Sequence, residues 1–299
     1  MASWPLDPAA GRSITARGPD MEVREIVHST AGQPATDGAG VRMTRIIGTR
    51  ELDMLDPFLL LDAFESDRPD DYIGGFPSHP HRGFETVTYL LAGRMRHKDS
   101  AGNEGVIEPG GVQWMTAGKG IVHSEMPEQE DGLLMGFQLW VNLPASAKMT
   151  DPAYQEFSPS ETPLERRTDG TEVRVIAGQT DQGTRGMVEN AHVEPTYLDV
   201  SLPADSSFDQ ATAAGSNAFL FVVEGSMAIG SKETPLGRRE LGILGEGEKI
   251  QATAGPNGAR FLLISARPLN EPVARGGPFV MNTRDEILQA FDDYQNGRF

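Results

Sequence analysis

Residues 76–91 read Phe-Pro-Ser-His-Pro-His-Arg-Gly-Phe-Glu-Thr-Val-Thr-Tyr-Leu-Leu and combine a strand pattern with two histidines at i and i+2. Side chains two positions apart share one face of an extended strand, so His79 and His81 can reach one point. Pro80 fixes its own φ and biases His79 toward extended geometry. The β-branched and aromatic run from Glu85 to Leu91 predicts the next strand. The stretch therefore favours a β fold that holds two imidazoles on one face.

A second pair of metal-binding side chains follows at His123-Ser124-Glu125, again at i and i+2. Three imidazoles and one carboxylate from two strands suit a divalent first-row metal ion. The alternative is that these are ordinary surface or core histidines. However, the four side chains fall in two short blocks of a chain that has only 6 histidines. We therefore predict a buried metal centre formed by His79, His81, His123 and Glu125.

The composition favours one large or two medium domains that are rich in short strands. The chain has 299 residues, of which 38% are hydrophobic, and its 34 glycines and 21 prolines indicate many turns. The net charge of −17 argues against a nucleic-acid-binding surface, because phosphate contacts need clustered lysine and arginine. The absence of cysteine excludes disulfides, thiolate metal sites and cysteine nucleophiles.

The N-terminal residues show no visible secretory signal. Residues 1–8 have neither a basic n-region nor an apolar h-region. No uncharged apolar run reaches the ~18–20 residues that are needed to span a bilayer. We therefore expect a cytoplasmic protein with no membrane partner. Residues 1–20 are rich in proline, glycine and alanine, and we expect them to form a tail.

Short apolar segments separated by turn residues predict an all-β protein built as antiparallel sandwiches or barrels. The expected strands include 85–91, 112–116, 121–126, 136–143, 172–176, 196–202, 218–223, 240–244 and 260–264, with a hairpin near 100–103. A short helix is expected at 152–157, in the segment that connects the two halves. At the C-terminus, Thr283 and Glu286 fit a capping box, and apolar residues at helical spacing predict a short helix that covers a sheet or barrel end.

The two halves of the chain look like one unit written twice. Residues 92–95, Ala-Gly-Arg-Met, resemble residues 224–227, Glu-Gly-Ser-Met, and further short matches follow in the same order. We therefore predict an N-terminal metal-binding domain at 21–150 and a C-terminal domain at 151–299. Counting from the matched glycines, the positions equivalent to His79, His81 and His123 fall on Ala211, Ala213 and Arg260, so the second domain is expected to lack metal ligands.

Two long motifs resemble the signature of the pirin family, whose members are two-domain proteins of the cupin superfamily. They are residues 76–91, quoted above, and residues 113–127, Gln-Trp-Met-Thr-Ala-Gly-Lys-Gly-Ile-Val-His-Ser-Glu-Met-Pro. The second half adds Gly-Gly-Pro-Phe-Val-Met-Asn-Thr at 276–283 and a terminal Gly-Arg-Phe. The resemblance extends from about residue 20 to the end. It implies two cupin-type β-sandwich barrels, a bicupin, with a metal ion only in the first.

The resemblance also implies a ligand set and a metal. The pirin ligands fall on His79, His81, His123 and Glu125. Glu85 follows the paired histidines as a ligand does in many cupins, but in pirins it is a strand residue or a neighbour of the site. Family members are described with iron, so Fe(II) is expected, with Zn, Mn, Ni, Co or Cu as the other candidates.

Several pirins resemble quercetin 2,3-dioxygenases in activity, and the animal protein is described as a nuclear cofactor of transcription. Four protein ligands leave one or two positions on an octahedral ion for substrate, water or oxygen. We therefore expect a dioxygenase that cleaves flavonols such as quercetin, consuming O2 and releasing carbon monoxide. Glu125 either remains a ligand or accepts the hydroxyl proton of the substrate as general base.

Two other interpretations stay open. The protein is either a metal-dependent regulatory protein that binds a protein partner, or an enzyme whose substrate is another enol or a catechol. A closed site would favour the regulator, and a ligand-sized cavity beside the metal would favour the enzyme. In each case we expect a monomer.

Side chains near the motifs also receive assignments. Gln113, Trp114 and Met115 either line the cavity or fill the barrel, and Met95 is assigned to the barrel core. Arg82 and Glu85 are candidates for bonds to the outer nitrogens of the histidine rings, because metal-bound histidines usually donate that nitrogen. His97 is expected in a solvated hairpin, and His28 and His192 are expected to be structural.

Overall fold

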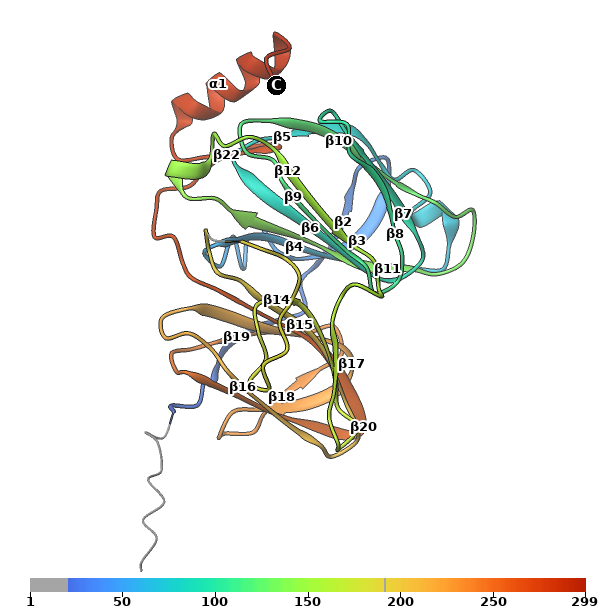
Figure 1. The fold of residues 1–299 in the computed structure, drawn as a ribbon, viewed down its shortest axis with the longest axis vertical. Helices are drawn as coiled ribbons and strands as arrows, with labels where there is room; N and C mark the ends of the chain where they lie inside the picture. The colour runs from blue at the N-terminus through green and yellow to red at the C-terminus, as the bar shows by residue number, and fades with distance from the viewer. Residues whose placement is uncertain (1–20, 191) are drawn as a thin grey trace, which may run out of the picture.

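Many strands alternate between buried and exposed side chains, as in residues 95–99, where positions 95, 97 and 99 are buried and the two between them are exposed. A strand of this kind buries one face against a second layer and leaves the other in water. The strands assemble into two β-sandwich barrels, drawn one above the other in Figure 1. The predicted all-β class is thus confirmed. The computed structural model describes residues 21–190 and 192–299, so the tail expected at 1–20 lies outside the described residues.

Two sheets form the N-terminal barrel. The larger sheet has seven strands in the order β12-β9-β6-β11-β4-β3-β2, and the smaller has four in the order β5-β10-β7-β8. The larger contains β2 (Gln33–Asp37), β3 (Val41–Ile47), β4 (Phe58–Ser66), β6 (Phe84–Ala92), β9 (Val112–Thr116), β11 (Leu134–Asn142) and β12 (Ala153–Phe157). The smaller contains β5 (Phe76–His81), β7 (Met95–Asp99), β8 (Glu104–Ile107) and β10 (Ile121–Pro127). Short 3-10 helices lie at Pro69–Asp71 (η1) and Ala145–Ala147 (η2).

A nine-stranded sheet forms the C-terminal barrel. Its main order is β1-β19-β17-β20-β15-β14-β13, and β16 and β18 pair with β20 and β17. The strands are β1 (Ile26–Thr30), β13 (Leu164–Arg166), β14 (Glu172–Ala177), β15 (Thr196–Leu202), β16 (Ser207–Ala211), β17 (Asn217–Ile229), β18 (Thr234–Gly237), β19 (Leu241–Leu244) and β20 (Lys249–Ala266). The long strands β17 and β20 have different neighbours at their two ends, because β17 pairs with β19 and then β18, and β20 pairs with β16 and then β15.

The two ends of the described chain exchange places between the barrels. β1, near the N-terminus, pairs with β19 of the C-terminal barrel. At the other end, β21 (Ala274–Gly276), β22 (Phe279–Met281) and α1 (Arg284–Gln295) lie on the N-terminal barrel, where α1 projects beyond the end that faces away from the C-terminal barrel (Figure 1). An ion pair of 2.7 Å between Arg82 and Asp293 holds α1 there. The predicted helix and its capping box between Thr283 and Glu286 are confirmed.

A shared apolar core joins the two barrels. Phe137 of β11 packs edge-on against Phe221 of β17, with ring centroids 5.4 Å apart. The hydroxyl of Tyr89 donates a 2.6 Å hydrogen bond to the carboxylate of Asp199 across the same interface. Because burial of large aromatic side chains is strongly stabilising, this core fixes one barrel against the other. Among the described residues, no helix combines the length and apolar character needed to cross a membrane.

The helix expected at 152–157 is wrong. Residues 153–157 form β12, which pairs antiparallel with β9 and places Gln155 opposite Trp114. The open edge of β9 offers backbone hydrogen bonds, and this tertiary pairing decides the conformation of a segment with weak local preference.

The residues matched between the halves also need correction. β5 and β10 place His79 opposite His123, and the corresponding strands β16 and β20 place Gln210 opposite Ile250. The pairs Met95–Pro127 and Met227–Ala254 fix this equivalence. The positions that match His79, His81 and His123 are therefore Gln210, Thr212 and Ile250, rather than Ala211, Ala213 and Arg260. Counting from Gly225 is off by one, because 15 positions separate it from Gln210 whereas 14 separate Gly93 from His79. Counting from Gly255 fails because this glycine lies after Ile250 within β20, whereas Gly118 precedes β10.

Candidate metal centre

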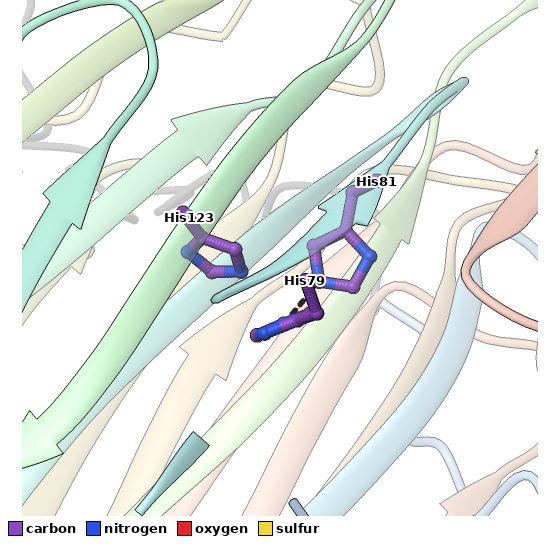
Figure 2. A group of neighbouring side chains, drawn as sticks. All are labelled: His79, His81 and His123. Atoms are coloured by element: carbon purple, nitrogen blue, oxygen red, sulfur yellow. Dashed lines mark hydrogen bonds between the residues drawn. The ribbon is translucent and has the colours of Figure 1, made fainter. Parts of the chain in front are cut away.

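Three imidazoles meet at one point inside the N-terminal barrel. His79 and His81 come from β5, and His123 comes from β10, where it lies directly opposite His79 in the antiparallel ladder. One ring nitrogen of each histidine lies within 4.8 Å of the others. Figure 2 shows the three rings turned toward a common space between the two strands. The convergence expected from the i and i+2 spacing is confirmed for these three side chains.

Glu125 shares the inward face of β10 with His123 and is only 2% exposed. Its carboxylate accepts hydrogen bonds of 2.7 Å from the hydroxyl of Thr88 and 3.0 Å from Nε2 of Gln138. Its carboxylate oxygens do not belong to the group of ligand atoms that lie within 4.8 Å of one another, which the three histidines form. Glu125 lines the cavity beside His79 and His81, so its role as a fourth ligand stays a prediction.

The outer nitrogens of two rings face backbone carbonyl groups. Nδ1 of His79 lies 2.8 Å from the oxygen of Pro77, and Nδ1 of His81 lies 3.4 Å from the oxygen of Pro278. Carbonyl oxygens only accept, so these Nδ1 atoms carry the protons and the Nε2 atoms carry lone pairs. The two Nε2 atoms are 3.0 Å apart, the contact dashed in Figure 2. Nε2 of His123 is buried and has no hydrogen-bond partner among the described residues.

This arrangement fits a bound cation. Two lone pairs at close range, with a third buried and unpartnered, are costly unless a positive ion sits between them. Burial, followed by the proximity of His79, lowers the pKa of His81 to about 3. Burial and the neighbouring histidines also hold the pKa of His123 well below its ordinary value. The two rings are therefore neutral at physiological pH, which is the form that binds a metal ion.

The solvated position expected for His97 is wrong. Its side chain is 0% exposed and lies between His123 and Asp99. Nδ1 of His97 is 3.4 Å from Nδ1 of His123, and Nε2 of His97 is 3.1 Å from the carboxylate of Asp99. The charged neighbours at 94, 96 and 98 suggested a solvated hairpin, but Met95, His97 and Asp99 alternate with them and point inward. That alternation was the signal that could have identified His97.

Arg82 and Glu85 do not bond to the histidine rings. Arg82 forms an ion pair with Asp293 and lies over the ring of Phe299, 4.4 Å from its centroid. Glu85 accepts a 2.7 Å bond from Thr116 and a further bond from Asn190. Thr88, which bonds to Glu125 inside the N-terminal barrel, lies on the opposite face of β6 from Glu85. Glu85 therefore points toward the other barrel, where it meets Asn190. Burial raises the pKa of Glu85 above the ordinary glutamate value.

A cavity of about 700 Å³ opens beside His79, His81 and Glu125. This volume is typical of a pocket for a small organic ligand. Apolar side chains of both sheets and the C-terminal segment form its walls, including Leu60, Phe64, Phe76, Trp140 and Val280.

The other side chains assigned from the sequence lie outside this cavity. Gln113, Trp114 and Met115 do not line it, and Met95 lies in the barrel core, as expected. Trp114 belongs to the core shared by the two barrels. His28 and His192 lie away from the site, on β1 and in the segment before β15.

Two arginines lie on the wall of the cavity and differ in their partners. Arg45 is bidentate to Asp62, at 2.9 and 2.8 Å, and also reaches Asp37 at 3.1 Å. Arg275 donates to the backbone oxygen of Asp53 at 3.2 Å, and its nearest approach to that carboxylate is 4.0 Å. The charge of Arg45 is thus balanced locally, whereas that of Arg275 is balanced only weakly by the described residues.

Comparison with known proteins places this chain in one family. Residues 40–141 match the family described as Pirin, and residues 197–299 match the Pirin C-terminal cupin domain. A pirin-like protein of Caulobacter vibrioides is 53% identical over 93% of this chain and 100% of its own length. A Pseudomonas aeruginosa protein provisionally named as a quercetin 2,3-dioxygenase is 48% identical over 92% of this chain and 97% of its own.

Solved structures agree with the sequence comparison. The crystal structure of a quercetin 2,3-dioxygenase from Acinetobacter baumannii superposes with a TM-score of 0.85 at 33% identity, and it covers 93% of this chain and 98% of that one. Two family models thus match successive parts of the chain, and the likeness to the solved structure covers 93% of it. The chain belongs to the pirin family, with two cupin domains.

Proposed function

We propose that this protein is a metal-dependent dioxygenase that cleaves flavonols such as quercetin. The observation that carries the proposal is the cavity of about 700 Å³ that opens directly beside His79, His81 and Glu125. A purely structural metal site is closed by its ligands, whereas a catalytic site keeps an open position that faces a substrate pocket. The names of the Pseudomonas and Acinetobacter relatives support the same chemistry.

The metal would be held by His79, His81 and His123, with Glu125 as the fourth ligand. Three neutral nitrogens and one carboxylate suit Fe(II), and also Mn, Co, Ni, Cu or Zn. When bound, the ion would supply Lewis acidity toward the substrate hydroxyl and, if it is redox-active, a path for electrons to dioxygen. The carbonyl groups of Pro77 and Pro278 orient two of the rings by accepting their Nδ1 protons.

Glu125 either remains a ligand or leaves the ion to act as general base for the 3-hydroxyl of the flavonol. Thr88 has a single hydroxyl proton, yet its oxygen lies 2.7 Å from Glu125 and 2.6 Å from Oε1 of Gln138. When Glu125 is ionised, Thr88 donates to it. After Glu125 takes the substrate proton, it can donate to Thr88, whose own proton then turns to Gln138. Both protonation states of Glu125 are therefore hydrogen-bonded inside the barrel.

The cavity wall is suited to a flat aromatic substrate. Trp140 lies near His81, with ring centroids 5.2 Å apart, and offers an aromatic surface beside the proposed ion. Arg275 provides a cation at the wall that can pair with a phenolate oxygen of the substrate. In the proposed reaction both atoms of O2 enter the cleaved product. The C2–C3 and C3–C4 bonds of the central ring break, and C3 leaves as carbon monoxide.

The test is turnover by the full chain loaded separately with Fe(II), Mn(II), Ni(II) or Cu(II). Loss of the visible absorption of quercetin, oxygen uptake and carbon monoxide release should occur in a ratio of one to one to one. A His123→Ala variant loaded in the same way is the control for reaction caused by free metal. Unchanged quercetin absorption with all four metals in aerated buffer would overturn the proposal. Tight metal binding without turnover would point instead to a regulatory protein.

A further inference from the structure

A chain of three side chains leads from the hairpin between β7 and β8 to the proposed metal site. The carboxylate of Asp99 lies 3.1 Å from Nε2 of His97, and Nδ1 of His97 lies 3.4 Å from Nδ1 of His123. All three side chains are buried, and His97 and Asp99 are each 0% exposed as side chains. Tyr154 packs on the ring of His97, with centroids 4.9 Å apart, and limits its rotation.

The hydrogen bonds around Asp99 fix it as an acceptor. One oxygen accepts from the backbone N–H groups of Ala101 and Asn103, at 2.9 and 3.0 Å, and the other accepts from the side-chain amide of Asn103 at 2.9 Å. These three partners are all N–H donors, as an ionised carboxylate requires. An ionised carboxylate has no proton to give, so His97 must donate through Nε2.

The position of that proton decides the next contact. A neutral imidazole carries one ring proton, so a proton on Nε2 leaves Nδ1 of His97 as an acceptor. The 3.4 Å contact then requires His123 to donate through Nδ1. The remaining nitrogen of His123, Nε2, is left with a lone pair, and it is the buried atom without a hydrogen-bond partner among the described residues.

We propose that Asp99 and His97 are positioning residues that lock His123 in the tautomer with its proton on Nδ1, so that Nε2 is always ready to bind the metal ion. The inference rests on the proposed metal site and explains how the third imidazole is prepared. The other two rings are set by backbone carbonyl groups, whereas His123 depends on a side-chain relay that begins in a surface turn. The opposite assignment would place a proton on Nε2 of His123, between the other two rings.

The direct test is ring-nitrogen NMR of the full-length protein, before and after addition of Zn(II). Long-range proton–nitrogen spectra distinguish protonated from unprotonated ring nitrogens. In the metal-free protein we expect a protonated Nδ1 and an unprotonated Nε2 for His123, and the reverse for His97. Protonation of Nε2 of His123 in the metal-free protein would overturn the proposal, whatever the activity of the loaded enzyme.

Variants separate the relay from simple packing. Asp99→Asn offers a donor where His97 needs an acceptor, so the proton on His97 should move to Nδ1 and that on His123 to Nε2. The affinity for Zn(II) should fall about 10–100-fold, the usual effect of losing a partner of a metal-bound histidine. His97→Gln can still accept from His123 and donate to Asp99, so it should retain more affinity than His97→Leu.

His28→Leu is the matched control, because it removes a histidine of β1 in the other barrel that only approaches Glu51, at 3.7 Å. It should leave the His123 signals and the affinity for Zn(II) unchanged. If Asp99→Asn leaves both tautomers in place, or if His97→Gln and His97→Leu lose equal affinity, the relay is refuted and the pair is only packing. Absence of Zn(II) binding in the unmodified protein would refute the proposed metal site, while the tautomers of the metal-free protein would still test the relay.

Discussion

Nδ1 of His81 lies 3.4 Å from the backbone oxygen of Pro278, although 197 positions separate the two residues in the chain. The contact depends on close approach of the C-terminal segment to the turn after β5. Gly83 makes that approach possible, since an added Cβ would lie 2.0 Å from the backbone oxygen of Val280. Its φ of +88° also lies in the region that favours glycine.

Gly83→Ala should therefore displace the C-terminal segment and loosen His81. We expect a loss of more than about 1 kcal/mol in the free energy of unfolding and about a tenfold loss of affinity for Zn(II). Chemical denaturation and calorimetric titration measure the two quantities. Gly215→Ala is the control, because Gly215 has a φ of +74° but no atom within 4 Å of an added Cβ. Equal effects of the two substitutions on metal affinity would contradict this prediction.

Removal of the Thr88 hydroxyl should slow turnover without unfolding the protein. Thr88→Val takes away the group that serves both protonation states of Glu125, so we expect kcat for quercetin to fall about 10-fold or more. Glu125→Gln should lower kcat further, by about 100-fold or more. Thr86→Val, two positions earlier on β6, removes a hydroxyl that has no hydrogen bond to Glu125 and should keep normal turnover. Steady-state kinetics with metal content measured for each variant decide the outcome.

Arg275→Gln should weaken substrate binding more than it slows the reaction. Burial lowers the pKa of Arg275 from its ordinary value, yet an arginine stays charged at neutral pH and can pair with a phenolate. We expect KM for quercetin to rise about 10-fold while kcat changes little. Arg166→Gln, which breaks an exposed pair with Glu172, is the matched control. An unchanged KM would remove Arg275 from the substrate site.

Lys148 should make the stability of the protein depend on pH in the alkaline range. Its ammonium group is buried and donates to the backbone oxygens of Gly83 and Val280, at 2.8 and 2.9 Å, and to Asn142 at 2.8 Å. Burial, partly offset by the charges of Glu271 and Glu286, lowers its pKa from 10.5 to about 8. Between these values the unfolded chain binds more protons than the folded protein, so the free energy of unfolding should rise with pH.

Comparison with Lys148→Met isolates this effect. The free energy of unfolding of the unmodified protein, relative to the variant, should increase by up to about 1.4 kcal/mol per pH unit above pH 8. The lost hydrogen bonds lower the stability of the variant at every pH and do not change this slope. Urea denaturation of both proteins at several pH values from 7.5 to 10 measures the difference. Parallel pH profiles would show that Lys148 has its ordinary pKa in the folded protein.

Local patterns in the sequence predicted the parts of the site that lie within single strands. Residues two positions apart on a strand must share a face, so the approach of His79 to His81 followed from spacing alone. The same rule applied to Met95, His97 and Asp99, but the charges between them drew attention to the solvent-facing side of β7. Reading each strand as two separate faces would have placed His97 inside the barrel.

Contacts between distant segments could not be predicted in this way. Neither the pairing of β12 with β9 nor the bond from His81 to Pro278 has a local signature, because each depends on how a connection returns across the barrel. The register between the two halves failed for a related reason. A one-residue difference before Gly225 moved the counterparts of His79 and His81 to the opposite face of the strand. The counterpart of His123 was misplaced because Gly255 lies within β20, whereas Gly118 precedes β10.

The exchanged ends of the chain also determine when the site can be completed during synthesis. The three imidazoles are translated within residues 79–123, but the carbonyl of Pro278 and the cavity wall at Arg275 and Val280 come more than about 150 residues later. The N-terminal barrel therefore remains unfinished on a nascent chain until residues 275–280 have been synthesised. A shorter nascent chain can hold the three imidazoles but lacks part of the surrounding wall.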